Sequence, residues 1–349
     1  MKKVRVGLVG LGPLGKVHAE NLMYRIPNAQ LTAVCTRTQS KLDAVRRDWE
    51  TPETYTDFAE MLDKAQLDAV AIISPTIKAQ LDAVAIISPT NVHVEHVRMA
   101  VEKGLHVFIE KPTGMNTAEC AEIERLAAQH DKIFAVGFMR RFDASYADAK
   151  RRIEAGEIGA PIFFRGYSLD PIWQGEAQVA RAEANGKWFV DMGVHDYDLA
   201  RWLLGAEPKQ AFACGGAYVF DGFAKNHDVD NGFSLVKFDN NAAAFFYCGR
   251  TAPHGSHVES EIIGTKGTLR ICESPRRARV TQFTGQGEVH ECIDHYLDRW
   301  GEAYYQELQQ FVNEVQAGEQ TQSATAADCT GAVKLAEMIL EAYEEQLDK

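Results

Sequence analysis

A glycine-rich turn near the N-terminus constrains the fold of this chain more than any other feature. It follows Val4–Val9, an apolar run typical of a strand, and precedes Lys16–Tyr24, which has the pattern of a helix. The first glycine permits the tight turn, the second lets a pyrophosphate approach the backbone, and the third lets the helix lie close to the strand. We therefore predict a dinucleotide-binding turn formed by Gly10, Gly12, Pro13, Leu14 and Gly15.

The end of the second predicted strand, Leu31–Cys35, bears on the choice of cofactor. An NAD site usually has an Asp or Glu there, which binds the ribose 2′-hydroxyl. After this strand, no carboxylate appears in the chain until Asp43. Basic and hydroxyl side chains could instead hold a 2′-phosphate, which favours NADP(H); NAD(H) is the alternative if the ribose is held in another way. The residues concerned are Thr36, Arg37, Ser40 and Lys41.

A 13-residue segment, KAQLDAVAIISPT, occurs twice in succession, at Lys64–Thr76 and at Lys78–Thr90, with a period of 14 residues. Its continuous apolar run is typical of a parallel strand buried on both faces. The alternation of strands and helices leaves one position in the sheet for these two copies. Chance does not produce such an identity, so the tandem duplication is recent or engineered.

Two placements of the copies are consistent with the sequence. If the first copy forms the strand, the second must loop out beside the cofactor. If the second copy forms it, Asn91 and His93 keep their place at the carboxyl end of the strand, where ligands bind in open α/β sheets. The first copy then loops out or extends the preceding helix. We expect the second copy in the sheet.

The next predicted strand, Leu105–Ile109, leads directly into Glu110-Lys111-Pro112. A lysine at the carboxyl end of such a strand, beside a cationic nicotinamide, would have a lowered pKa and could handle protons. The alternative is an exposed lysine that follows a strand. With a further helix and strand up to Gly137, the first half is predicted to be an α/β domain with a doubly wound parallel sheet.

The second half has a different pattern, with six strand-like runs between Ile162 and Ile271. We predict an α+β domain with a large open antiparallel sheet. The face of such a sheet is often covered by another subunit, so we expect a homo-oligomer, a dimer or a tetramer. The predicted domains are residues 1–137, 138–325 and a C-terminal segment, 326–349.

Trp188–Leu203 is predicted to begin a helix in this half. Asp191 and His195 are four residues apart, so a continuous helix would place them on one face. A carboxylate there can orient a histidine and raise its basicity, as a base that removes a hydroxyl proton requires. The alternatives are that Asp191 is an N-cap and that Asp198 and Arg201 form a surface pair.

Composition and charge exclude several classes of function. The net charge of −12 argues against nucleic-acid or anionic-membrane partners, which need a basic surface. The apolar run near the N-terminus is too short for a signal peptide or a membrane span. The seven cysteines are scattered, which predicts a reducing cytoplasm and no zinc or other metal site.

Four motifs, GLVGLGPLG, HVFIEKP, GFMRRFD and DMGVHDYDLARWL, occur in this order along the chain. Together they resemble the Gfo/Idh/MocA family of oxidoreductases, and within it the inositol dehydrogenases. The resemblance covers nearly the whole chain. It implies that Lys111 and His195 are catalytic, that Asp191 assists, and that Arg141 lies near the substrate.

The same resemblance implies that the loop after the fourth strand lies near the cofactor, and that the C-terminal helix Thr325–Leu347 packs beside the first domain. The residues expected at the cofactor are Ser88, Asn91, His93 and, at the same edge of the sheet, Glu110. The family often has a glycine pair before its D-x-x-x-H segment, where this chain has Gly186-Lys187-Trp188. The substrate could therefore differ from myo-inositol.

The residues and the resemblance together predict an NAD(P)-dependent dehydrogenase that acts on a secondary alcohol of a cyclic polyol or sugar. A neutral substrate is expected, because the chain lacks the basic cluster of a sugar-phosphate pocket. Two alternatives are an inosose or ketosugar reductase working in the opposite direction, and a regulator of the same fold that senses NAD(P) without chemistry. The catalytic trio argues against the regulator.

Overall fold

The computed structural model describes residues 3–49, 52–65, 81–180, 187–271, 275–278 and 280–347. The chain divides into two compact units. Unit 1 contains residues 1–138 and 304–330, and unit 2 contains residues 139–303 and 331–349. The expected domains, residues 1–137, 138–325 and 326–349, stay a prediction.

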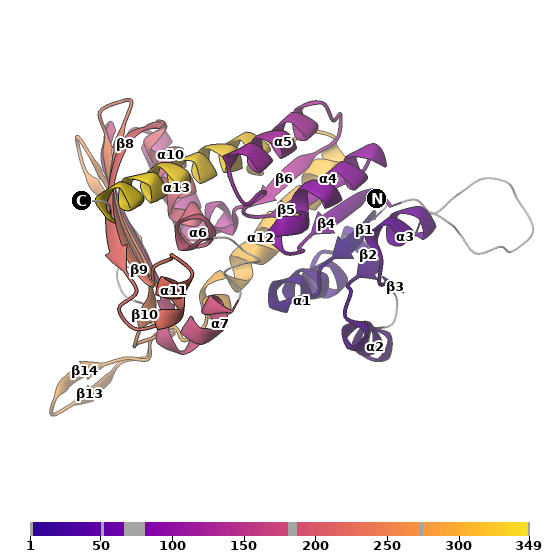
Figure 1. Ribbon diagram of the computed structural model, residues 1–349, viewed down its shortest axis with the longest axis horizontal. Helices are drawn as coiled ribbons and strands as arrows, with labels where there is room; N and C mark the ends of the chain where they lie inside the picture. The colour runs from indigo at the N-terminus through magenta and orange to yellow at the C-terminus, as the bar shows by residue number, and fades with distance from the viewer. Residues whose placement is uncertain are drawn as a thin grey trace, which may run out of the picture. The chain divides into compact units, whose positions relative to one another are not determined.

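Unit 1 contains six parallel strands in the order β3-β2-β1-β4-β5-β6 (Figure 1). This is the strand order of a doubly wound dinucleotide-binding sheet. The strands are β1 Val4–Val9, β2 Ala29–Cys35, β3 Glu53–Tyr55, β4 Ala83–Ile86, β5 His106–Glu110 and β6 Phe134–Gly137. The helices between them are α1 Pro13–Glu20, α2 Gln39–Asp48, α3 Phe58–Lys64, α4 His93–Glu102 and α5 Thr117–Ala128.

Helices cover both faces of this sheet, as its continuous apolar strands require. On one face, Ala83 and Ala85 of β4 and Phe108 of β5 share a core with Leu308 and Phe311 of α12, which runs from Tyr296 to Ala317. Helices α1 and α2 contribute to the same core. Helices α4 and α5 contact each other and α4 contacts β4 and β5. The predicted doubly wound domain is confirmed.

The second copy of the repeated segment forms β4, as predicted. Residues Ala83–Ile86 pair with β1 on one side and with β5 on the other. All four side chains are fully buried. Lys64 and Ala65 of the first copy end helix α3. The remainder of that copy lies outside the described residues, so its placement stays undecided between the two alternatives.

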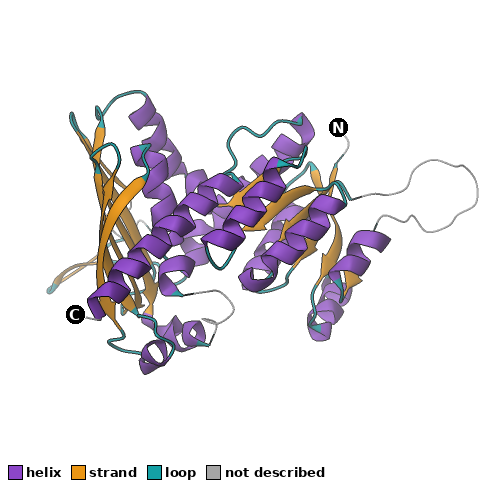
Figure 2. Ribbon diagram, turned by 45° about the horizontal axis from the view of Figure 1, so that its top comes forward, coloured by secondary structure: helices purple, strands orange, loops and turns teal. Residues whose placement is uncertain are grey.

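Unit 2 contains a six-stranded sheet in the order β12-β11-β7-β10-β9-β8. Figure 2 draws the strands of the chain in orange. The strands of the unit 2 sheet are β7 Pro161–Pro171, β8 Pro208–Gly216, β9 Asn231–Phe238, β10 Ala243–Ala252, β11 His257–Gly264 and β12 Thr268–Ile271, and β13 Gln282–Thr284 and β14 Gly287–Val289 form a separate hairpin. The predicted α+β domain with a large open sheet is confirmed, but the sheet is mixed rather than antiparallel throughout, because β7 and β10 pair in parallel. The parallel pair could not be predicted, because alternating apolar residues indicate a strand but not the direction of its neighbour.

Five shorter helices and one long helix follow in the described part of unit 2. The helices are α6 Ala144–Glu154, α7 Gly175–Val179, α9 Trp188–Asp191, α10 Val194–Leu204, α11 Asp221–Lys225 and α13 Ala326–Leu347. Helix α10 packs on the buried face of the sheet, where the rings of Tyr197 and Phe246 meet edge to face at 5.0 Å. Among the described residues, no helix has the length and apolar character needed to cross a membrane.

The duplication permits a matched test of the β4 assignment. Ala85 is fully buried in β4, and Ala71 is its equivalent in the first copy. We expect Ala85→Asp to lower the free energy of unfolding by about 4 kcal/mol or more, because it buries an unpaired charge. Ala71→Asp leaves β4 intact and should have a much smaller effect in the same denaturant titration. Equal losses would show that both copies contribute to the strand.

Candidate active site

The phosphate turn of unit 1 has the backbone geometry that its glycines permit. Gly10 has a φ of 101°, and a Cβ built there would lie 2.3 Å from the carbonyl oxygen of Ile87. A Cβ on Gly15 would lie 1.9 Å from the carbonyl oxygen of Gly10. Both positions therefore need glycine because backbone segments approach closely.

Gly12 differs from these two glycines. It is the N-cap of α1, and no described atom lies within 4 Å of a Cβ built there. Packing within the protein therefore does not explain the glycine. Space beside the first turn of a helix, with the amide end of the helix directed at it, suits the pyrophosphate of a dinucleotide.

The end of β2 presents polar side chains to the surface. The Thr36 N–H donates to the carbonyl oxygen of Tyr55 at 3.1 Å, which fixes this residue beside β3. Arg37 and Ser40 are exposed, immediately before and within the first turn of α2. They are placed where a ribose or its 2′-phosphate would lie in a Rossmann domain.

His93 connects two loops at the carboxyl edge of the sheet. Its ring lies 2.8 Å through Nε2 from the carbonyl oxygen of Ser88, and 3.0 Å through Nδ1 from that of Pro112. The side chain is buried, and this burial lowers its pKa. Ser88 also binds the His96 ring through Oγ at 2.9 Å, while Asn91 is exposed. His93 therefore orders the loops, and its contact with a cofactor stays a prediction.

Lys111 follows β5 on a segment that is held by several groups. Its backbone N–H donates to Oε2 of Glu110 at 3.2 Å, and its peptide bond to Pro112 is cis. The Thr113 N–H contacts Sγ of Cys329 at 3.3 Å. The Lys111 side chain is partly exposed. Unit 1 thus has a fixed lysine at the edge where β1 and β4 also end.

The residues Asp191 and His195 belong to unit 2, and the continuous helix predicted through them was wrong. Helix α9 ends at Asp191, and α10 begins at Val194. A Cβ on Gly193 would lie 2.4 Å from Oη of Tyr197, so the turn packs against that ring. Because the helix is interrupted, the four-residue spacing no longer places the two side chains on one helix face. Their cooperation stays a prediction.

Asp191 has a partner that the sequence did not indicate. Nη2 of Arg250, in β10, lies 3.0 Å from its carboxylate. The Arg250 side chain is 3% exposed, whereas that of Asp191 is 22% exposed. Arg250 occupies an inward position among the apolar residues of its strand. An arginine at an inward position of an otherwise apolar strand is the sequence feature that could have indicated this partner of Asp191.

The two arginines of the GFMRRFD motif both bind carboxylates of α10. Arg140 pairs with Asp196 at 3.0 Å, and Arg141 makes two bonds to Asp198, from Nε at 2.9 Å and Nη2 at 2.5 Å. Asp198 is buried and binds Arg141, whereas Arg201 binds Glu207, so Asp198 is more than a member of an exposed surface pair. The interaction of Arg141 with a substrate stays a prediction.

Removal of either partner from the buried pair of Arg140 and Asp196 should destabilise unit 2, because the other partner would remain as an unpaired buried charge. Their side chains are 6% and 0% exposed. We expect Asp196→Ala to lower the free energy of unfolding by about 3–5 kcal/mol, because it leaves a buried guanidinium unpaired. Asp148→Ala, which removes the exposed partner of Arg151 and Arg152, is the control and should have a small effect. Similar losses in chemical denaturation would contradict this assignment.

Comparison with known proteins identifies the family of the chain. Residues 4–138 match the oxidoreductase family with an NAD-binding Rossmann fold, GFO_IDH_MocA, and residues 146–270 match the GFO/IDH/MocA C-terminal domain. The chain is 35% identical over 328 residues to scyllo-inositol 2-dehydrogenase (NAD(+)) of Bacillus subtilis, covering 94% of this chain and 90% of that protein. It is 30% identical to myo-inositol 2-dehydrogenase of Thermotoga maritima, covering 90% and 89%.

A solved structure of scyllo-inositol dehydrogenase from Lactobacillus casei, with bound NAD(H) and scyllo-inositol, is similar over 99% of this chain and 98% of that one. Its TM-score is 0.90 and its sequence identity is 34%. The agreement of sequence and fold extends through both units. The chain therefore belongs to the GFO/IDH/MocA family of oxidoreductases.

Proposed function

We propose that this protein is an NAD-dependent dehydrogenase of an inositol or a similar neutral cyclic polyol. The observation that carries the proposal is the similarity, along nearly the whole chain, to relatives named as inositol dehydrogenases. In the reaction, a ring CH–OH becomes a ketone, hydride passes from that carbon to nicotinamide C4, and the hydroxyl proton leaves to a base. The phosphate turn would hold the cofactor, whose bound nicotinamide supplies the hydride acceptor.

The proposed roles follow the chemistry of each side chain. His195 removes the hydroxyl proton, and Asp191, which Arg250 also binds, assists it. Lys111 donates a hydrogen bond to the reacting oxygen and takes part in proton transfer. Arg141 has five N–H donors, two of which bind Asp198, and we propose that another reaches a ring hydroxyl.

Two other functions were considered from the sequence. A reductase of an inosose or ketosugar would use the same residues in the opposite direction, so it differs only in the physiological substrate. A regulator that senses NAD(P) would not need a proton-transferring lysine and histidine. The names of the relatives favour the dehydrogenase over the regulator.

We propose NAD(H) rather than NADP(H) as the cofactor. The expectation of NADP(H) was based on Arg37, Ser40 and Lys41, which are all exposed after β2. The Bacillus subtilis relative is named for NAD(+), and the Lactobacillus casei structure contains NAD(H). These relatives give no support to a preference for NADP(H). NADP(H) is the alternative, and a comparison of turnover with NAD+ and with NADP+ distinguishes the two cofactors. The cytoplasmic location also stays a prediction.

The activity is tested by recording the absorbance of reduced nicotinamide with NAD+ or NADP+ and a panel of inositols and aldoses. We expect turnover with NAD+ and at least one inositol. Lys111→Ala should lower kcat by about 100-fold or more while NAD+ still binds, because proton transfer at the reacting oxygen is lost. Lys103→Ala, at an exposed lysine of the same unit, is the control. Full activity of Lys111→Ala, or no turnover of the unmodified protein with any inositol, would refute the proposal.

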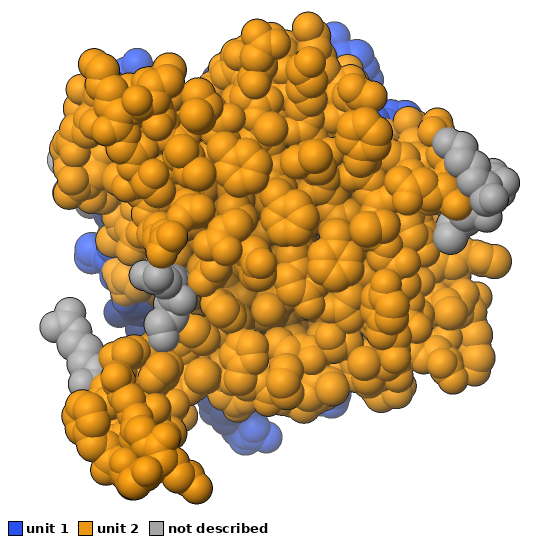
Figure 3. Space-filling model, turned by 90° about the vertical axis from the view of Figure 1, so that its left-hand side faces the viewer, with its two compact units in different colours: residues 1–138, 304–330 blue, residues 139–303, 331–349 orange. Residues whose placement is uncertain are grey.

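We also propose that copies of the chain associate through the outer face of the unit 2 sheet, which Figure 3 shows from that side. Apolar residues lie next to one another across three strands of this face. Leu235 of β9 pairs in register with Phe212 of β8 and with Phe245 of β10. Leu235 and Phe212 are 46% and 55% exposed. An apolar face of this kind on a soluble chain is commonly covered by another subunit.

This association predicts a homo-oligomer that a single charge weakens. Leu235→Asp should shift the sedimentation equilibrium toward the monomer, because it places a charge on the apolar face. Tyr24→Asp, at a 66% exposed residue of unit 1, is the control and should leave the mass unchanged. A monomeric unmodified protein, or an unaltered mass of Leu235→Asp, would contradict the proposal.

A further inference from the structure

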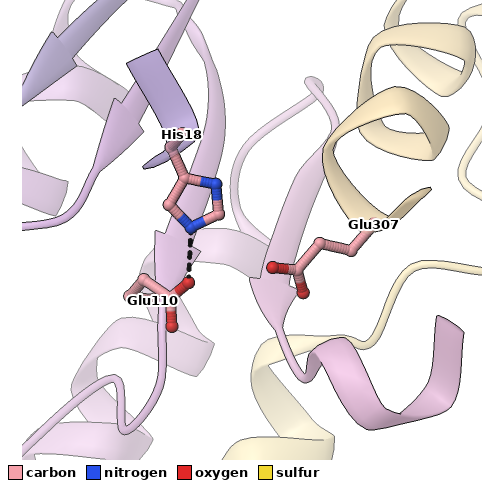
Figure 4. A group of neighbouring side chains, drawn as sticks. All are labelled: His18, Glu110 and Glu307. Atoms are coloured by element: carbon pink, nitrogen blue, oxygen red, sulfur yellow. Dashed lines mark hydrogen bonds and ion pairs between the residues drawn. The ribbon is translucent and has the colours of Figure 1, made fainter. Parts of the chain in front are cut away.

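A buried acid in unit 1 has no role in the proposed chemistry. Glu307 of α12 is 1% exposed, and neither of its carboxyl oxygens has a hydrogen-bond partner among the described residues. Figure 4 shows its carboxyl group directed toward Glu110 of β5 and His18 of α1. One ligand atom from each of the three side chains lies within 4.8 Å of the other two. Such an arrangement costs free energy, so it calls for a physical explanation.

Glu110, in contrast, has two hydrogen-bond partners on its carboxyl group. Nε2 of His18 lies 2.8 Å from Oε1, and the Lys111 N–H donates to Oε2 at 3.2 Å. The carboxylate also packs on Gly137 of β6, where a Cβ would lie 3.1 Å from Oε1. Glu110 therefore joins three parts of unit 1, namely the helix after the phosphate turn, the backbone of Lys111 and the last strand of the sheet.

The two carboxyl groups cannot both be ionised without a large cost, because they are close together and buried. Burial, and after it the charge of Glu110, raise the pKa of Glu307 well above its usual range. An N–H donor stabilises an ionised carboxylate, and the Lys111 N–H donates to Glu110, which also has the His18 ring beside it, whereas Glu307 has no hydrogen-bond partner among the described residues. The proton of the pair therefore resides on Glu307.

We propose that Glu307 is a positioning residue for Lys111. Glu307 is a protonated, neutral acid that lies next to Glu110, and it acts on Lys111 through Glu110. In its neutral form Glu307 adds no second charge, so Glu110 keeps its contacts with His18 and with the Lys111 N–H and orients the Lys111 backbone. The titratable groups that face Glu307 are Glu110 from β5 and His18 from α1, with Tyr304 of its own helix packed against the His18 ring at 5.7 Å. A divalent cation held by His18, Glu110 and Glu307 is the competing occupant.

The free energy of unfolding, measured as a function of pH, distinguishes a neutral Glu307 from a site that holds a divalent cation. The folded state holds a proton on Glu307 that the unfolded state releases above a pH of about 4.3, so the contribution of Glu307 to the stability of the unmodified protein decreases as pH rises from there to the folded pKa. Glu307→Gln has no proton to release. Its folding equilibrium constant should therefore exceed that of the unmodified protein, by a ratio that grows about tenfold per pH unit in this range.

Glu319→Gln is the matched control, because Glu319 is an exposed glutamate just after the same helix. It should follow the pH dependence of the unmodified protein. A Glu307→Gln variant that is less stable than the unmodified protein, or a difference that does not change with pH, would overturn the neutral acid. Stabilisation of the chelator-treated protein, but not of Glu307→Gln, by added Zn²⁺ or Mn²⁺ would replace it with a metal site.

The positioning role has a second readout, which rests on the proposed function. Ionisation of Glu307, as pH rises through its raised pKa, places a second charge beside Glu110, so kcat of the unmodified protein should fall over that range. Glu307→Gln should retain kcat at neutral pH and move this fall to higher pH, with the KM for the polyol little changed. An unchanged pH profile of kcat would contradict the role. Absence of turnover in every variant would instead refute the proposed function, and the unfolding experiment would still test Glu307.

Discussion

The pairing of β4 with β1 on one side and β5 on the other is the interaction on which the functional edge of unit 1 depends. Parallel strands end at the same edge of a sheet, so this pairing brings the phosphate turn, the Ser88 loop and Lys111 to one edge. His93 then joins the last two through the carbonyl oxygens of Ser88 and Pro112. A repeated strand could have disturbed this arrangement, but the second copy occupies the sheet and keeps its own downstream loop in place.

Charged side chains inside both units support the groups that are proposed to react. In unit 2, Arg140 and Arg141 bind carboxylates of α10, the helix that carries His195, and Arg250 binds Asp191. In unit 1, His18 binds Glu110, the residue before Lys111. Buried ion pairs add little net stability, but they fix geometry because a displaced partner would be left charged and unsolvated. Their positions favour a role in holding the candidate catalytic residues.

The parts of the fold that could be predicted were those that depend on residues close together in the sequence. Continuous apolar runs indicated the buried strands of unit 1, and the glycine turn indicated its first crossover. The break between α9 and α10 was not predicted, because the four-residue spacing of Asp191 and His195 fits a continuous helix as well as an interrupted one. The parallel pairing of β7 and β10 was missed for a similar reason, since the partner of a strand is chosen by topology.

The candidate site divides in the same way. The sequence by itself determined the glycines of the turn, the lysine after β5 and the motifs that indicate the family, because each depends on residues that are adjacent or regularly spaced. Only the tertiary structure decided which copy of the repeat forms β4, which carboxylates the motif arginines bind, and that Glu307 lies against Glu110. These features involve residues that lie far apart in the chain. They depend on burial and charge pairing between those residues, which exist only in the folded protein.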